Sequence, residues 1–193
     1  MKLIIASNNA HKIREIKTIL SGRFEEILSL REAGIDHETI EDGVTFAENA
    51  LKKAREIAAI SGYASLADDS GISANALGGA PGVYSARFSG ETDPDLRDAA
   101  NNALLVAKLK DKEDRSAYYS CAMALVYPDG REIVAEGFMH GHIIDEPRGE
   151  RGFGYDPFFV PVGETRTVAE MSDEEKNCIS HRANALKDLL SKI

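Results

Sequence analysis

Two adjacent carboxylates, Asp68 and Asp69, follow the short apolar segment 64–67 and precede Ser70 and Gly71. The pattern predicts a strand that ends at the carboxyl edge of a sheet, where open α/β folds bind ligands. Like charges this close repel each other, and a metal ion or a raised carboxyl pKa would relieve the repulsion. Successive strand residues point to opposite faces, so the two aspartates are expected to have different tasks. An Asp-capped turn is the alternative interpretation.

A second polar segment, residues 7–12 (SNNAHK), lies between an apolar run and a helical pattern. Backbone N–H groups at the start of a helix favour an anion, and Asn8 or Asn9 could cap this helix. Lys12 falls in the first turn, where a cation is unfavourable unless a negative group lies nearby. Neither a Walker loop nor the dinucleotide-binding glycine pattern is present. A capped helix with a solvated lysine is the alternative.

A glycine-rich segment, GERGFGYDPFF, places Phe153 and Tyr155 among Gly149, Gly152 and Gly154. Glycines at this density suit a backbone that must approach something closely. Aromatic rings on such a loop could stack on a nucleobase. A turn followed by a strand whose aromatic residues fill the core is an equally good interpretation of this segment alone.

Potential cations also open the last helical pattern, where Ser180 is a suitable cap and His181 and Arg182 occupy the first turn. This arrangement favours an anion or an acceptor oxygen opposite them. His140 and His142 share one face of a predicted strand, and without a third ligand we interpret them as structural. No nucleophile elbow surrounds the serine that follows the two aspartates, so serine hydrolase chemistry is not predicted.

The elements that would position these groups follow from the spacing of apolar residues. Strands are predicted at residues 2–7, 24–30, 64–67, 117–127, 131–144 and 158–162, and helices at 13–20, 45–61, 93–110, 173–176 and 181–192. Residues 77–90 and 147–156 are predicted loops, and PDG at 128–130 is a hairpin signal. Strands interleaved with helices, plus one antiparallel hairpin, indicate an α/β fold with a mixed sheet.

Composition limits the partners. The chain has 193 residues with 23 Lys+Arg against 32 Asp+Glu, a net charge of -9, and such a length suits one domain or two closely packed lobes. No apolar run is long enough for a membrane span or a secretory signal. The acidic balance argues against a nucleic-acid polymer but permits a small phosphorylated ligand bound with a metal ion. Cys121 and Cys178 are expected to be reduced, buried fillers in a cytoplasmic protein.

Together, the segments resemble the inosine triphosphate pyrophosphatases, which hydrolyse ITP, dITP and XTP to the monophosphate and pyrophosphate. The matching segments span residues 6–186 in family order: ASNNAHKIREI, EDGVTFAENALKKA, ADDSGISANALGGAPGVYSARFSG, GERGFGYDPFF and KNCISHRANAL. The resemblance implies a single domain over residues 1–193, with an elongated mixed β-sheet flanked by helices and two lobes around a central cleft. It also implies a homodimer.

The resemblance assigns roles residue by residue. Glu41 and Asp69 would bind Mg²⁺, with Asp69 also the candidate base. The substrate-binding residues would be Ser7, Asn8, Asn9, Ala10, His11 and Lys12 at the triphosphate, Ser70, then Phe153, Gly154, Tyr155 and Asp156 at the base and sugar, and Lys176, His181 and Arg182 at phosphate and base. The family commonly has glycine where this chain has His11, which puts a bulkier side chain beside the phosphates.

Chemistry accounts for these residue types. Magnesium prefers one or two carboxylates together with waters and phosphate oxygens. Water attacking the α-phosphorus must be oriented or deprotonated, and Asp69 is suited to this. Lys12, Lys52 or Lys53, and Lys176 could neutralise charge on the departing pyrophosphate. Donors such as Arg182, His181 or backbone N–H groups would accept a 6-oxo purine and oppose the amino group of adenine.

Two other functions remain open at this point. One is a hydrolase on the same scaffold with a different base preference, or one that releases phosphate instead of pyrophosphate. The other is a nucleotide-binding module without turnover. The cluster of Glu41, Asp68 and Asp69 argues against simple binding, because carboxylates repel a polyphosphate.

Overall fold

A six-stranded sheet with the order β2-β1-β3-β4-β5-β6 forms the framework of the computed structural model, which describes residues 2–193. The strands are β1 (Lys2–Ile5), β2 (Glu26–Ser29), β3 (Ala64–Ala74), β4 (Ser116–Val126), β5 (Glu132–Ile143) and β6 (Phe159–Pro161). β1 pairs in parallel with both β2 and β3, whereas β5 and β6 are antiparallel. The predicted mixed α/β sheet is therefore confirmed.

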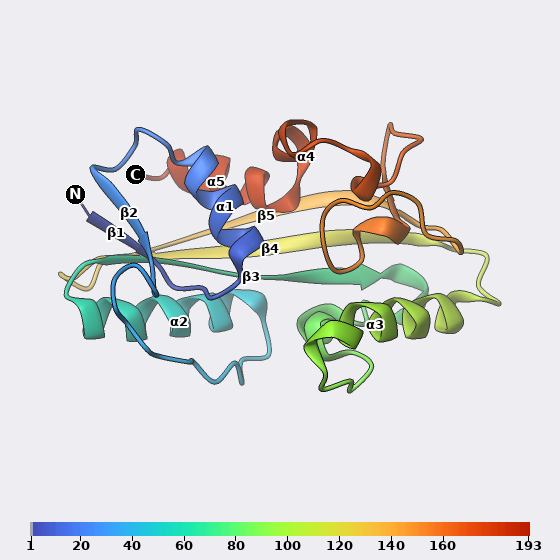
Figure 1. Ribbon diagram of the computed structural model, residues 1–193, viewed down its shortest axis with the longest axis horizontal. Helices are drawn as coiled ribbons and strands as arrows, with labels where there is room; N and C mark the ends of the chain where they lie inside the picture. The colour runs from blue at the N-terminus through green and yellow to red at the C-terminus, as the bar shows by residue number, and fades with distance from the viewer. Residues whose placement is uncertain (1) are drawn as a thin grey trace. The chain divides into compact units, whose positions relative to one another are not determined.

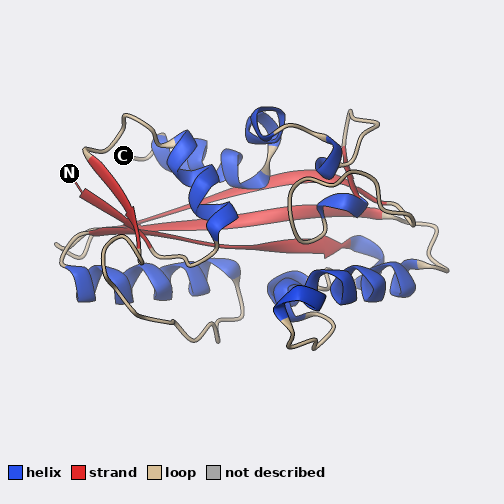
Figure 2. Cartoon of the chain, in the orientation of Figure 1, coloured by secondary structure: helices blue, strands red, loops and turns tan. Residues whose placement is uncertain are grey.

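Helices alternate with the strands along the chain (Figure 2). They are α1 (Ala10–Ile19), α2 (Phe46–Ser61), α3 (Pro94–Leu109), α4 (Asp173–Ile179) and α5 (His181–Leu190), with short 3₁₀ helices η1 (Asn75–Leu77), η2 (Gly82–Arg87), η3 (Asp156–Phe158) and η4 (Val168–Glu170). No helix among residues 2–193 has the length and apolar character needed to cross a membrane.

The helix predicted at residues 45–61, α2, begins and ends where its capping residues indicate. Thr45 caps α2 and forms a capping box with Glu48, so that two backbone N–H groups at the helix start are satisfied. At the other end Gly62 adopts the left-handed conformation, with φ of 69°. These two signals explain why the sequence located both ends correctly.

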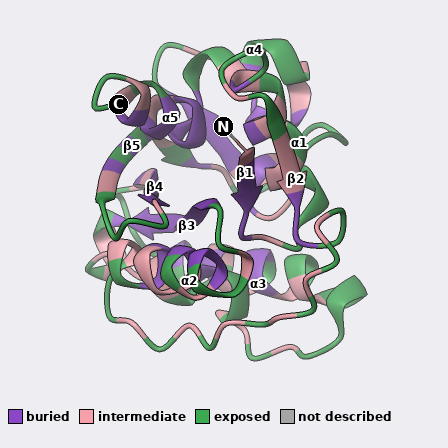
Figure 3. Cartoon of the chain, turned by 90° about the vertical axis from the view of Figure 1, so that its left-hand side faces the viewer, coloured by how far each residue is buried: buried purple, intermediate pink, exposed green. Residues whose placement is uncertain are grey.

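The chain forms two compact units, each with its own core. The first unit comprises Met1–Asp69, Cys121–Gly137 and His181–Ile193. Within it, α1 and α5 cover one face of the strands and α2 covers the other (Figure 1). Figure 3 shows the strands of this unit buried between those helices. Its apolar side chains include Leu3, Ile5, Ile16, Leu66, Met123 and Leu186 on one face, and Ile4, Ala50, Ala54 and Ile57 on the other.

The second unit comprises Ser70–Ser120 and Phe138–Ser180. Its core brings α3 and the glycine-rich segment together with the last residues of β3 and β5 and the first residues of β4. The members of this core include Ile72, Leu105, Leu109, Tyr119, Met139, Tyr155 and Phe159. Because β3, β4 and β5 each pass from one unit into the other, the chain builds both cores on the same strands.

The predicted end of the third strand is wrong. β3 does not stop at the two aspartates but continues to Ala74. Gly71 serves close packing here and not a turn, since a Cβ at this position would lie 2.3 Å from the Ser85 hydroxyl oxygen. That hydroxyl donates to the Gly82 carbonyl and accepts from the Ile72 N–H. Part of the predicted loop 77–90 is accordingly folded as η2 against the strand.

The two cysteines differ. Cys121 is buried in β4, and burial raises the pKa of its thiol to about 12, with the negative charge of Asp68 adding to the effect. Cys178 is exposed, so the prediction that it fills a core is wrong. The reason lies in α4, which buries Lys176 and leaves Cys178 outward. Neither cysteine forms a disulfide, as expected.

Candidate active site

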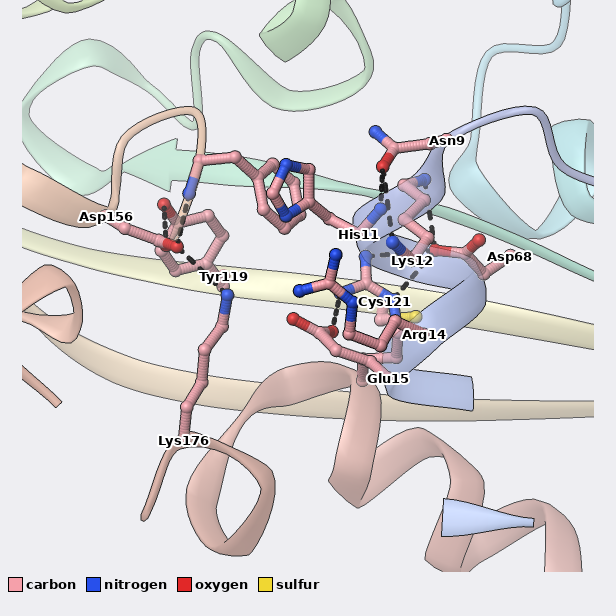
Figure 4. A network of polar contacts seen from close by, with 12 residues as sticks. Asn9, His11, Lys12, Arg14, Glu15, Asp68, Tyr119, Cys121, Asp156 and Lys176 are labelled. Carbon is pink, nitrogen blue, oxygen red and sulfur yellow. Dashed lines mark hydrogen bonds and ion pairs between the residues drawn. The ribbon is translucent and has the colours of Figure 1, made fainter. Parts of the chain in front are cut away.

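Asp68 is the centre of a buried group of ion pairs within the first unit. Its Oδ2 atom lies 3.0 Å from the Lys12 ammonium and accepts from the Arg182 guanidinium at 3.1 and 3.2 Å. The third Arg182 contact, at 2.5 Å, is with Glu15. Figure 4 shows Lys12 and Glu15 of α1 beside Asp68. These four residues, Lys12, Glu15, Asp68 and Arg182, are called the Asp68 cluster below.

Opposite charges set the pKa values of Asp68 and Arg182 in the Asp68 cluster. Burial favours the neutral acid, but Lys12, Arg182 and Lys53 outweigh it and hold the pKa of Asp68 well below its usual range. The side chain of Arg182 is only 1% exposed, and burial acts to lower its pKa. The charges of Asp68 and Glu15 outweigh that effect and raise it. Asp68 thus keeps Lys12 and Arg182 in fixed positions.

Asp69 faces a different set of partners, as the alternation along a strand requires. Its Oδ2 atom accepts a hydrogen bond of 2.9 Å from the Asn49 amide on α2. The amide oxygen of Asn49 in turn accepts from the Gly43 N–H at 2.8 Å. A Cβ at Gly43 would lie 2.6 Å from that oxygen, so only glycine fits. Asn49 therefore ties the loop that carries Glu41 to Asp69.

Lys53 interacts electrostatically with both predicted metal ligands, Glu41 and Asp69. Its ammonium lies 2.5 Å from Glu41 Oε1 and its side chain is 13% exposed. Burial lowers the pKa of Lys53, but the charges of Asp68, Asp69 and Glu41 together raise it above its ordinary value. Lys52 instead pairs with Asp42 at the surface. The structure thus distinguishes the two lysines that the sequence left equivalent.

The pKa of Asp69 is raised. Burial is the main cause, the Lys53 charge opposes it, and the negative charge of Glu41 raises it further. The charge of Glu41 therefore acts on Asp69. The described residues contain no cluster of three or more His, Cys, Asp or Glu side chains able to enclose a metal ion. Two carboxylates suit Mg²⁺, which keeps waters and phosphate oxygens as its other ligands.

The predicted phosphate-binding turn leads into α1. Asn9 caps the helix, and its side-chain oxygen accepts from the N–H groups of His11 and Lys12 at 3.0 and 3.2 Å. The Ser7 hydroxyl accepts from the Asn9 N–H at 3.2 Å. Asn8, Ala10 and His11 are exposed beside this cap. Of the two asparagines that could cap the helix, Asn9 does so, and Lys12 finds its negative partner in Asp68.

In the second unit Asp156 organises the glycine-rich segment. It accepts from the Phe153 N–H and from the Lys176 ammonium, both at 3.0 Å, and from the Tyr119 hydroxyl at 3.2 Å. Figure 4 shows Tyr119 and Lys176 converging on this carboxylate. The Lys176 nitrogen lies 4.7 Å from the centre of the Phe153 ring. A Cβ at Gly152 would lie 2.2 Å from the carboxylate, which explains the glycine.

The two aromatic residues of this segment have different surroundings. Tyr155 belongs to the core, and its hydroxyl donates 2.7 Å to the Ser85 carbonyl. Phe153 is half-buried. The ring suited to stack on a ligand is therefore Phe153, while Tyr155 anchors the segment.

The remaining predicted residues divide between the units. His181 is buried at the first position of α5 in the first unit. Ser70 is half-buried in β3 at the start of the second. The structure brings together Glu41, Asp69 and Lys53 in one unit, and Phe153, Asp156 and Lys176 in the other.

Sequence reasoning missed four residues: Glu15, Asn49, Tyr119 and Lys53 as distinct from Lys52. A signal existed for two of them. Asn49 and Lys53 lie one helical turn apart within the apolar stripe Phe46, Ala50, Ala54, Ile57 of α2. Polar residues on the buried face of a helix indicate a polar task. For Glu15 and Tyr119 the partners are too distant in sequence to be found this way.

Comparison with known proteins decides the family. The model of the Ham1 family matches residues 3–192. The chain belongs to the Ham1 family. This confirms the resemblance drawn from the sequence motifs.

Similar proteins match over most of their length. A protein of Exiguobacterium sp. named dITP/XTP pyrophosphatase is 47% identical over 193 residues, which cover 100% of this chain and 97% of that protein. A Bacillus subtilis protein of the same name is 46% identical, over 96% and 93% of the two chains. The solved structure of the Staphylococcus aureus Ham1 protein has a TM-score of 0.88 at 38% identity, covering 100% and 97%.

Proposed function

We propose that this Ham1 family chain catalyses the Mg²⁺-dependent hydrolysis of dITP, ITP and XTP to the nucleoside monophosphate and pyrophosphate. The observation that carries the proposal is that Glu41 pairs with the half-buried ammonium of Lys53 while Asn49 links Asp69 to the loop that carries Glu41. The names of the relatives support the substrate class. Such a reaction would remove deaminated purines from the nucleotide pool.

Glu41 and Asp69 would hold Mg²⁺. The ion would supply positive charge at the phosphate oxygens, which stabilises charge developing there in the transition state. Asn49 would keep the two carboxylates in register through its bonds to Asp69 and Gly43. Lys53 pairs with Glu41. It would therefore lie near the Mg²⁺ held by Glu41 and could contact the phosphate oxygens bound to that ion.

Asp69 would orient the water that attacks the α-phosphorus and accept its proton. A raised pKa brings a carboxylate closer to the working pH and makes it a better base. Lys12 and Lys53 would stabilise the departing pyrophosphate. Lys53 replaces Lys52 in this role because it is half-buried and pairs with Glu41, whereas Lys52 pairs with Asp42 at the surface.

The second unit would bind the nucleoside. Phe153 offers a ring for stacking, and the Lys176 ammonium beside it is a donor suited to a 6-oxo group. Adenine would present its amino group to that donor, so the pairing would be lost. Arg182 would act by holding Asp68, because its guanidinium already contacts two carboxylates. His181, at the start of α5, stays a candidate donor.

Three further expectations belong to the same proposal. The protein would act in the cytoplasm, would work as a homodimer, and would use no nucleic-acid polymer or membrane as partner. The net charge of -9 supports the absence of a polymer.

A panel of standard and non-standard nucleoside triphosphates, assayed with Mg²⁺, tests the proposal. We expect hydrolysis of ITP, dITP and XTP well above that of ATP, with pyrophosphate as product and no activity in EDTA. Equal rates across the panel would contradict the base preference. Release of orthophosphate would favour a different hydrolase, and tight binding without turnover would favour a nucleotide sensor.

Matched neighbours sharpen the assignment of residues. Glu41→Gln should lower kcat at least about 100-fold, while Asp42→Asn, one residue away and exposed, should stay within about twofold. Lys53→Met should likewise lower kcat, and Lys52→Met, one residue away, is its matched control. Asp69→Asn should abolish turnover and leave the protein folded. Parental rates in Asp69→Asn would refute the catalytic role of this residue.

A further inference from the structure

Helix α3 holds both backbone polar groups of Gly154, its N–H and its carbonyl, in the glycine-rich segment. The Gly154 N–H donates to the Asp98 carboxylate at 2.7 Å, and the Gly154 carbonyl accepts from the Asn102 amide at 2.8 Å. Asp98 and Asn102 lie one helical turn apart on α3, so their side chains share a face. Asp98, Asn102 and the Gly154 peptide groups are called the α3 clamp below.

The clamp restrains a glycine whose own surroundings leave it room to move. Gly154 has a φ of +62°, and a Cβ built on it would meet nothing within 4 Å. Backbone conformation and not lack of space therefore explains this glycine. A glycine with open space around it can rotate unless its peptide groups are bonded. Phe153, which precedes it, would lose its fixed position if Gly154 turned.

The orientation of Asn102 favours positioning over stability as its task. Asn102 is 5% exposed, and its amide nitrogen donates to the carbonyls of both Asp98 and Gly154. Its side-chain oxygen is buried without a hydrogen-bond partner among the described residues. A buried acceptor left in this way is unfavourable, so an apolar residue would serve the core better. What only asparagine provides here is the bond to Gly154.

The next residue along the segment is fixed by a neighbouring part of the same helix. Asn101 donates to the carbonyls of Ser85 and Ala86, and the Ser85 carbonyl also accepts from the Tyr155 hydroxyl. Asn101 and Tyr155 thus share one acceptor, the Ser85 carbonyl. This carbonyl belongs to η2 and links α3 indirectly to the glycine-rich segment.

We propose that Asp98 and Asn102 are positioning residues that set the affinity for the nucleoside part of the substrate by fixing Phe153 through Gly154. The inference rests on the proposed function, because it takes Phe153 as the stacking ring. It predicts a selective defect. Binding of the base should weaken, while binding of the phosphate chain, assigned to residues of the other unit, should not change.

The test compares Asp98→Ala and Asn102→Leu with the parent and with Asp95→Ala. Asp95 provides a matched control, since it is an exposed carboxylate on the first turn of the same helix, outside the clamp. We expect KM for ITP to rise about tenfold in the two clamp variants, with kcat within about threefold of the parent. Inhibition by inorganic tripolyphosphate, which has no base or sugar, should be unchanged.

A conservative variant separates positioning from loss of charge. Asp98→Asn removes the charge but keeps an oxygen that can accept from the Gly154 N–H. It should restore KM to within about threefold of the parent. If Asn102→Leu lowers the melting temperature, the exposed Asp98 variants still decide the matter.

The outcomes distinguish the two proposals. Parental protein that hydrolyses no non-standard purine triphosphate would refute the proposed function and this inference with it. Parental activity together with KM values in the clamp variants no higher than in Asp95→Ala would refute the clamp alone. So would an equal weakening of tripolyphosphate inhibition, because that would show a general structural defect.

Discussion

Neighbouring aspartates in this chain have opposite electrostatic surroundings. Lys12 and Arg182 hold the pKa of Asp68 low, whereas burial, with the charge of Glu41 adding to it, raises the pKa of Asp69. The division follows from the strand, which points successive side chains to opposite faces. One carboxylate can therefore be structural while the adjacent one is available for chemistry.

The first prediction concerns that structural carboxylate. Asp68→Asn keeps the size of the side chain but leaves Arg182 buried with one carboxylate instead of two. Breaking a buried ion pair from one side costs about 3–5 kcal/mol. Urea unfolding should show a loss of this order, against less than about 1 kcal/mol for Asp42→Asn at the surface. Equal losses in the two variants would contradict the central place of Asp68.

How far the sequence could lead at this scale differs between residues. The sequence predicted that Asn8 or Asn9 caps α1, because a cap bonds to backbone groups only two or three residues away. Arg182 was expected at a ligand, yet its guanidinium contacts Asp68, 114 residues away in the chain. Pairing over such a distance depends on how α5 packs against the sheet, and spacing alone does not encode it.

At the scale of elements, the sequence located both ends of α2 but not the end of β3. Thr45 and Gly62 are local signals that act through a single hydrogen bond or backbone angle. Ser70 and Gly71 look like a turn in sequence but lie inside β3. The small size of Gly71 is needed for η2 to pack against the strand, which is a tertiary requirement.

The second prediction concerns the packing of α5. A Cβ at Gly137 of β5 would lie 2.1 Å from the Ala185 backbone nitrogen and 2.3 Å from the His181 carbonyl oxygen. Backbone atoms cannot turn aside as a side chain can, so Gly137→Ala should displace α5 and destabilise the protein by about 1–3 kcal/mol.

Chemical unfolding of Gly137→Ala beside Glu136→Ala measures this effect. Glu136 is the exposed neighbour on the same strand, and its replacement should change stability by no more than about 0.5 kcal/mol. Because His181 and Arg182 begin α5, activity in Gly137→Ala should fall as well. An unchanged unfolding midpoint would show that the helix adapts without cost.

At the scale of the molecule, the fold class and family were predictable because motifs are spread from one end of the chain to the other. The resemblance implied two lobes, but the sequence did not locate the boundary between the two units. No linker marks the boundary, because the chain passes from one unit to the other within the strands β3, β4 and β5.

The third prediction concerns assembly. The proposed homodimer would have twice the 21.0 kDa mass of one chain, and sedimentation equilibrium should report it. Protein at the monomer mass across the micromolar range would contradict the expectation. With a net charge of -9, the same protein should not shift duplex DNA in a gel at physiological salt.

Because the two thiols differ in exposure, the reactivity of the buried one can be used to measure unfolding. Cys178 is exposed, whereas Cys121 lies inside β4 with a pKa near 12, so its reactive thiolate is almost absent at neutral pH. A thiol-specific chromogenic reagent should therefore titrate one group rapidly in the native protein and two in denaturant. The slow second group would report each opening of the first unit's core in unmodified protein. Rapid reaction of both would mean that β4 is far more accessible than its burial indicates.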